Sequence, residues 1–140
     1  MKQYLLSVCI LFVCISGTLL LPQRSYGQLN GAYTINPAKA ASSTNYKSWA
    51  SAVSDLVSGT RSDGGTAKGP GVSAAVTFSV YDTLYANTNV AISAITGASS
   101  TNRITFKSAK GDSSKCRLTY PTSTYTIDAN DYVLLLDGAD

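Results

Sequence analysis

The 140-residue sequence contains no histidine and no glutamate, and all eight of its acidic residues are aspartates. Histidine is the usual general base at neutral pH and the commonest zinc ligand. Its absence excludes Ser-His-Asp hydrolysis, Cys-His proteolysis and His-bound zinc within this chain. The absence of glutamate excludes glycoside cleavage by paired glutamates. Charged residues make up 14% of the chain and apolar ones 44%, which is too apolar for a disordered chain, and the length predicts one domain.

The first 27 residues have the layout of a secretory signal. Lys2 precedes an apolar run, residues 5–21, and a short polar stretch then places small residues at Ser25 and Gly27. The apolar run is short for spanning a bilayer core of roughly 30 Å. A cleaved signal peptide (residues 1–27) is therefore favoured over a retained anchor, and we expect a secreted or cell-surface protein with no stable membrane span after cleavage.

Cleavage after Gly27 would leave a nearly neutral chain with one thiol. Two of the three cysteines lie in the apolar run, so Cys116 alone remains and no internal disulfide can form. Removing Lys2 and Arg24 leaves nine basic residues against eight aspartates, a net charge of +1. No general attraction to nucleic acid is predicted from this balance.

Residues 28–73 are predicted to form an N-terminal cap of one strand, one helix and a glycine-rich loop. Residues 31–35 are typical of a short edge strand that ends at Asn36-Pro37. A helix is expected to start at a Ser43 or Thr44 cap and to end at Gly59. Its predicted apolar stripe consists of Tyr46, Trp49, Ala50, Val53, Leu56 and Val57. We expect Trp49 to be buried on this stripe rather than to stack on a sugar.

The loop of residues 58–73 contains five glycines, and such loops can hold phosphate where a strand enters and a helix leaves. Here a helix precedes the loop, and Lys68 comes before Gly69 rather than after it. A flexible surface loop is therefore the favoured interpretation.

From residue 74 onward the pattern is one of short strands and polar turns. Apolar residues alternate with polar ones around Phe78, Ile92, Phe106, Leu118 and Ile127. An antiparallel sandwich and a solenoid of stacked coils both fit this spacing. The run from Tyr132 to Leu136 is apolar on both faces and should lie in the middle of a structure. The sequence ends four residues later, which predicts an interrupted fold.

Three phrases together resemble a known family: Val76-Thr77-Phe78-Ser79-Val80, the ITGASSTNRITF stretch of residues 95–106, and residues 131–139. They are similar to the N-terminal part of large secreted bacterial surface proteins with a right-handed parallel β-helix, the pectin-lyase-like architecture. The resemblance covers about residues 31–140. It implies a mainly β fold: the start of a right-handed parallel β-helix. Residues 28–73, which include the α-helix, would cap its N-terminal end. Residues 74–140 would form its first coils, truncated at the C-terminus.

The resemblance implies two functions from different classes. The first is a non-catalytic capping and first-coil segment of an exported cell-surface or adhesion-type protein. The second is the N-terminal fragment of a polysaccharide-degrading enzyme whose active coils lie beyond residue 140. No cofactor is expected, and this chain alone is not expected to be an enzyme.

Four basic side chains are candidate ligands for an acidic polysaccharide or cell-surface glycan: Arg103, Lys107, Lys115 and Arg117. All four are predicted to face outward, so parallel stacking could align them in a basic stripe. Such a stripe could bind uronate or sulfated sugars, or only keep the surface soluble; the second role is the favoured one.

No metal site is predicted. Asp128, Asn130 and Asp131 resemble the start of a calcium loop, but Ala139 stands where the bidentate glutamate belongs and Val133 where glycine belongs. A turn between strands explains this cluster better. Cys116 alternates with outward bases, so it is expected to point inward as a small apolar side chain.

Overall fold

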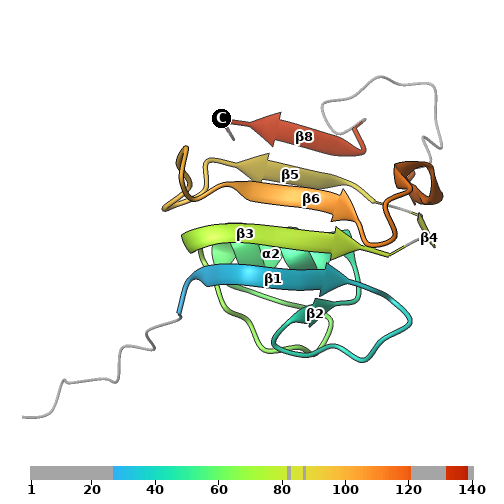
Figure 1. Ribbon diagram of the computed structural model, residues 1–140, viewed down its shortest axis with the longest axis horizontal. Coiled ribbons are helices and arrows are strands. Elements are labelled where there is room, and N and C mark those ends of the chain that lie inside the picture. The colour runs from blue at the N-terminus through green and yellow to red at the C-terminus, as the bar shows by residue number, and fades with distance from the viewer. Residues whose placement is uncertain (1–26, 82, 87, 121–131, 139–140) are drawn as a thin grey trace, which may run out of the picture.

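The computed structural model describes residues 27–81, 83–86, 88–120 and 132–138. Strands dominate this part of the chain, with one α-helix and one short 3-10 helix (Figure 1). In chain order the elements are β1 (Leu29–Ile35), β2 (Asn45–Tyr46), α2 (Trp49–Ser58), β3 (Val72–Val80), β4 (Thr83–Tyr85), β5 (Val90–Ser93), β6 (Ile104–Ser108), η1 (Ser113–Lys115), β7 (Cys116–Leu118) and β8 (Leu134–Asp137).

Every strand pair among the described residues is parallel. One sheet has the order β2-β1-β3-β6, and two smaller sheets pair β4 with β7 and β5 with β8. These pairings rule out the antiparallel sandwich for the described strands and confirm the mainly β character. The predicted edge position of residues 31–35 is wrong, because β1 lies between β2 and β3. Asn36-Pro37 ends that strand without making it an edge.

Pairing follows the order of the chain. The three strands β3, β4 and β5 pair, in that order, with β6, β7 and β8. In Figure 1 the strands β1, β3 and β6 run in one direction across the picture, and β5 and β8 run in the opposite direction. The chain therefore passes twice along the same three-strand path, with the second pass stacked on the first.

The helix α2 begins later than predicted. Its N-cap is Ser48, whose side chain accepts a hydrogen bond from the Ser51 N–H, and not Ser43 or Thr44. The reason is that Asn45 and Tyr46 form β2 beside β1 instead of a first helical turn. The helix ends where predicted: its C-cap Gly59 adopts a left-handed conformation, φ 67°, and the Gly59 N–H donates a hydrogen bond to Asp55 O.

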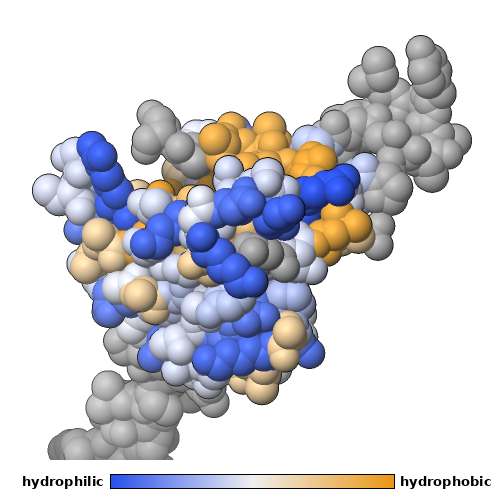
Figure 2. Space-filling view, turned by 45° about the vertical axis from the view of Figure 1, so that its right-hand side comes forward, coloured by the Kyte–Doolittle hydropathy of each residue, from blue (hydrophilic) through white to orange (hydrophobic). Residues whose placement is uncertain are grey.

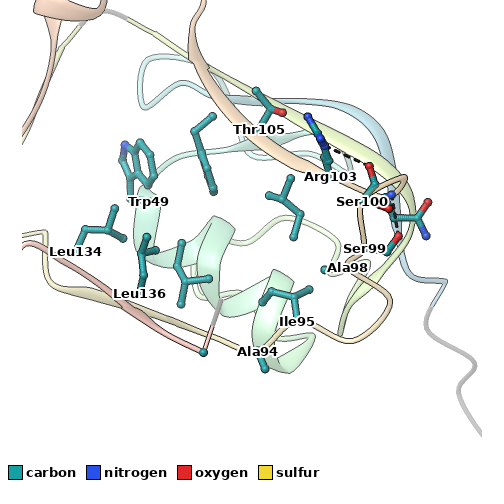
Figure 3. Close-up of a pocket in the computed structure, with 15 residues that line it drawn as sticks. Trp49, Ala94, Ile95, Ala98, Ser99, Ser100, Arg103, Thr105, Leu134 and Leu136 are labelled. Atoms are coloured by element: carbon teal, nitrogen blue, oxygen red, sulfur yellow. Dashed lines mark hydrogen bonds between the residues drawn. The ribbon is translucent and has the colours of Figure 1, made fainter. Parts of the chain in front are cut away.

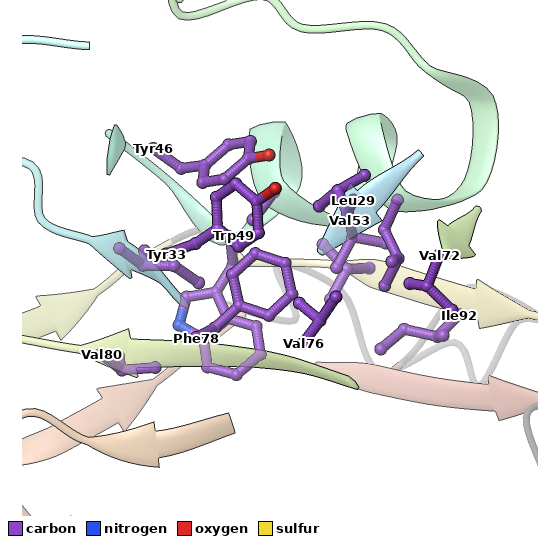
Figure 4. Close-up of a cluster of buried hydrophobic side chains, with 14 of the residues drawn as sticks. Leu29, Tyr33, Tyr46, Trp49, Val53, Val72, Val76, Phe78, Val80 and Ile92 are labelled. Atoms are coloured by element: carbon purple, nitrogen blue, oxygen red, sulfur yellow. The ribbon is translucent and has the colours of Figure 1, made fainter. Parts of the chain in front are cut away.

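The core lies between α2 and the strands β1, β3 and β5. Figure 4 shows the rings of Tyr33, Tyr46, Trp49 and Phe78 gathered there, with valine and isoleucine side chains beside them. The buried apolar residues are Leu29, Tyr33, Ile35, Tyr46, Trp49, Ala52, Val53, Leu56, Val72, Val76, Phe78, Val80, Tyr85, Val90 and Ile92. Trp49, Val53 and Leu56 are buried, as predicted for the inner face of the helix, whereas Ala50, predicted on the same face, is exposed. A helix of this length is stabilised mainly by what its apolar face packs against.

The glycine-rich loop is attached to the helix rather than free on the surface. The N–H groups of Lys68 and Gly69 donate to the Asp55 carboxylate at 2.7–3.0 Å, and the Gly71 N–H donates to Leu56 O at 2.9 Å. A side chain at Gly69 would collide with the backbone carbonyl of Asp55. Glycine is therefore needed for this close approach. The expectation of a flexible surface loop is wrong for these residues.

Candidate functional site

The four predicted basic residues are all exposed, as expected from their alternation with inward-facing neighbours. Arg103 directly precedes β6, and Lys107 lies within it. Lys115 ends the short helix η1, and Arg117 is the middle residue of β7. The four side chains thus belong to one stretch of chain, and the two that lie in strands, Lys107 and Arg117, belong to different sheets.

They do not form a stacked stripe. Parallel stacking aligns residues from successive passes of the chain, and the register partner of Lys107 is Ser79, while that of Arg117 is Leu84. No second basic residue lies beside either one along the stacking direction in these pairs. The predicted alignment is wrong because all four bases lie on the same pass, 103–117.

Arg103 has a different surrounding from the other three. Its Nε donates to Ser100 O at 3.2 Å, at the end of a turn in which Asn102 Nδ2 donates to Gly97 O at 3.1 Å. The same turn is closed by a hydrogen bond of 3.0 Å from the Asn102 N–H to the Ser99 hydroxyl. This polar turn forms one rim of a hollow in the molecule (Figure 3).

The hollow has a volume of about 840 Å³ and mainly apolar walls (Figure 3). Trp49 and Phe106 stack within it, with their ring centroids 4.7 Å apart. The apolar side chains around them are Ile92, Ile95, Ile104, Leu134 and Leu136. Leu136 is 62% exposed, and Leu134 and Leu135 are also exposed. Figure 2 shows hydrophobic residues gathered near the top of the molecule, the end at which Figure 1 places β8.

Sequence reasoning missed a buried polar cluster around Asp55. The Asp55 carboxylate is fully buried and accepts a hydrogen bond of 2.7 Å from the Tyr46 hydroxyl besides those of the loop. Arg61 lies over the Tyr46 ring, 3.9 Å from its centroid, and donates to Ser42 O and Asn45 O at 2.7 Å each. An aspartate among the apolar positions of the helix was the available signal, because a buried charge requires partners.

Arg61 and Asp63 form a salt bridge of 2.9 Å whose side chains are only 1% and 6% exposed. Burial on its own would raise the pKa of the Asp63 carboxyl. Hydrogen bonds from Arg61 and from the backbone N–H groups of Lys47 and Gly65 outweigh burial and lower that pKa to about 2. Burial, and then the hydrogen bond to Asp55, raise the pKa of the Tyr46 phenol well above its ordinary value. These groups hold loops together and face one another, so the cluster is structural.

The search for a metal centre covers residues 27–81, 83–86, 88–120 and 132–138. No group of three or more cysteine or acidic side chains that could hold a metal ion is found there. Asp128, Asn130 and Asp131, considered above as a calcium loop, lie outside the described residues, as do residues 1–26 of the expected signal peptide 1–27. Cys116 packs against the core, and its thiol donates to Val80 O at 3.4 Å, which confirms its inward orientation.

Among the residues that the structure describes, none of the helical segments has the length and apolarity needed to cross a membrane. No protein-family model matches the chain, and no curated protein or solved structure matches it either.

Proposed function

We propose that this chain is the helix-capped start of a right-handed parallel β-helix in an exported cell-surface or adhesion-type protein, and that this segment is non-catalytic. The observation that carries the proposal is the ordered pairing of β3, β4 and β5 with β6, β7 and β8. In a solenoid each coil repeats the path of the one before and contacts only its neighbours. Right-handed connection is the rule for parallel strands joined by a crossover.

The position of the helix supports the capping role. A solenoid needs a cover at its end, because a terminal coil otherwise leaves its apolar interior in water. The helix α2 packs against β5, which pairs with β8 on its other side. It also precedes the first coil in the chain, where an N-terminal cap belongs. Tyr46, Asp55 and Arg61 then bind the loops of the cap to one another.

Export is the second part of the proposal and rests on the layout of residues 1–27. Expression of the whole chain in a secreting bacterial host should give a product whose N-terminus lies at or near Gln28, as read by mass spectrometry. The matched control replaces two residues of the apolar run, Leu11→Arg and Val13→Arg, and should stay in the cell with Met1 intact. An intact Met1 on a membrane-embedded wild-type product would contradict the proposal.

A non-catalytic role is tested on the same secreted product. The product should release no sugar from pectin, alginate or chitin with added calcium. Calcium-dependent turnover that is lost in Arg103→Ala or Arg117→Ala would instead support a polysaccharide-degrading enzyme. In that case the exposed bases would act on the substrate.

A further inference from the structure

The start of β1 carries the single Asn-Gly pair of the sequence, Asn30-Gly31. The side-chain carbonyl carbon of an asparagine can be attacked by the backbone nitrogen of the residue that follows it. Glycine hinders this attack least, because it has no Cβ and adopts many backbone conformations. The rate of the reaction in a folded protein therefore depends on the exposure, the hydrogen bonding and the backbone freedom of the pair.

Both residues lie in open space, although their neighbours are buried. Asn30 and Gly31 are exposed, whereas Leu29 is fully buried and Tyr33 is 5% exposed. A Cβ placed on Gly31 would meet no atom within 4 Å. The Asn30 backbone N–H donates to the Tyr33 hydroxyl at 3.2 Å, but the Asn30 side-chain amide makes no hydrogen bond to any residue that the structure describes. The amide is thus open to water and unrestrained by a partner.

The backbone is irregular at this pair. Gly31 has a φ of 78°, outside the extended region of a regular strand. The register with β3 shifts at the same place, where the two residue steps from Leu29 to Gly31 lie opposite four steps on β3. On the other side, among the described residues, β2 pairs with the last two residues of β1 and not with its start (Figure 1). Sheet pairing therefore restrains this pair less than it restrains the rest of β1.

We propose that Asn30 of the folded protein deamidates and isomerises through attack by the Gly31 nitrogen, so that this pair is a site of spontaneous covalent modification. The Gly31 nitrogen forms a bond to Asn30 Cγ and gives up its proton, and the side-chain nitrogen leaves with that proton as ammonia. Water then opens the succinimide ring and returns a proton to the Gly31 nitrogen. Opening at Cγ gives aspartate, and opening at the main-chain carbonyl carbon gives isoaspartate.

The fold can accommodate both products. Aspartate replaces a neutral amide with a carboxylate on an exposed side chain. Isoaspartate adds one methylene group to the main chain between residues 30 and 31, where β1 has fewer residues than the segment of β3 opposite it. We therefore expect Leu29 and Tyr33 to keep their buried positions. The inference is independent of the proposed function, because it needs neither export nor further coils.

Two other positions of the chain serve as internal comparisons. Asp63-Gly64 also places glycine after an acidic side chain, but the Asp63 carboxylate is 6% exposed and is held by Arg61 and by the Gly65 N–H. Asn45 is fully buried, and its Nδ2 lies 3.1–3.2 Å from three backbone carbonyl oxygens. Neither side chain is free to react, so both should stay unchanged in the folded protein.

The test follows the purified whole chain during incubation at mildly alkaline pH, with circular dichroism to show that it stays folded. Peptide mapping by mass spectrometry should show progressive conversion at Asn30, with the mass shift of an amide replaced by an acid, and none at Asn45. Isoaspartyl methyltransferase with S-adenosylmethionine should label the isoaspartate fraction. Asn30→Gln is the matched control, since its longer side chain would have to close a six-membered ring, and it should show neither change over the same time.

A parallel incubation in urea separates the folded protein from the unfolded chain. Conversion of Asn30 in the folded protein, at a rate comparable to that in urea, is the expected result. Conversion in urea alone would show that the sheet holds the pair in an unreactive geometry, and would overturn the inference. Equal conversion of Asn30 and Asn45 in the folded protein would overturn it as well, because exposure and hydrogen bonding would then not decide the site.

Discussion

At the scale of single residues, Trp49 links the helix α2 to both passes of the chain. Its ring stacks on Phe106 at 4.7 Å and meets Tyr85 edge-on at 6.5 Å. The indole Nε1 finds no hydrogen-bond partner among the described residues, so the ring contributes through packing. Only 7% of the residue is exposed.

Trp49→Ala is therefore expected to destabilise the fold by about 3–5 kcal/mol, the usual cost of truncating a buried tryptophan. Chemical unfolding followed by circular dichroism measures this directly. Thr105→Ala, an exposed change on β6, should alter the unfolding free energy by less than about 0.5 kcal/mol. Similar stabilities for the two variants would show that the ring is not buried between the helix and the strands.

A second residue-scale prediction concerns pH. The Asp63 pKa in the folded state, about 2, lies below its ordinary value of 3.8. The folded state thus favours the charged carboxyl, and its stabilisation is complete above about pH 4 and lost as the pH falls towards 2. Asp63→Asn should destabilise the protein at pH 6 by on the order of 1–2 kcal/mol, and the difference from wild type should shrink by pH 2.

Urea unfolding at pH 6, 4, 3 and 2 measures this dependence. Asp112→Asn is the control, because Asp112 is exposed and caps only the short helix η1. A difference in unfolding free energy between wild type and Asp63→Asn that is the same at all four pH values would contradict the stabilising role of the Arg61–Asp63 salt bridge.

At the scale of elements, the sequence was informative where periodicity is strong and misleading where one residue can serve two structures. The C-cap Gly59 and the burial of Trp49, Val53 and Leu56 follow from spacing alone. Tyr46 also fits the helical spacing, yet it forms β2, because its ring is buried beside Tyr33 and Phe78 and under Arg61. These partners come from distant parts of the chain, so local pattern cannot reveal them.

The turn between β5 and β6 gives an element-scale prediction. Gly97 has a φ of 84°, and a Cβ there would collide with the Val72 carbonyl oxygen, whereas Gly111 has a φ of 82° with open space around it. Gly111→Ala should cost about 1–2 kcal/mol for the left-handed conformation alone. Gly97→Ala should cost clearly more, because the turn must also move away from β3.

Thermal unfolding of Gly97→Ala and Gly111→Ala measures the difference in their stabilities. The cost of the left-handed conformation is common to both variants, so the difference reports the collision at Gly97. Equal melting temperatures would mean that the Gly97 turn does not lie against the start of β3. That result would place the turn, and with it the polar rim of the hollow, elsewhere.

At the scale of the whole molecule, the choice between a sandwich and stacked coils could not be made from alternation alone. Both architectures place apolar residues at every second position of short strands. The exposed leucines of β8 show the same limit, because the apolar run predicted burial, yet all three leucines are exposed and Leu134 and Leu136 line an open hollow. The four bases were correctly predicted to face outward, but their alignment depended on which pass each one occupies.

The second pass of the chain lies parallel on the first, with Phe78 beside Phe106. Disulfide formation between pairs of introduced cysteines, in a Cys116→Ala background, tests this pairing. Neighbouring strands are about 4.8 Å apart, within the range for a disulfide, while residues two positions out of register are roughly 8 Å apart and beyond it. Parallel pairing predicts that Thr77→Cys forms a disulfide rapidly with Thr105→Cys and none with Lys107→Cys. The opposite result, which an antiparallel pairing centred on Phe78 and Phe106 would give, would contradict it.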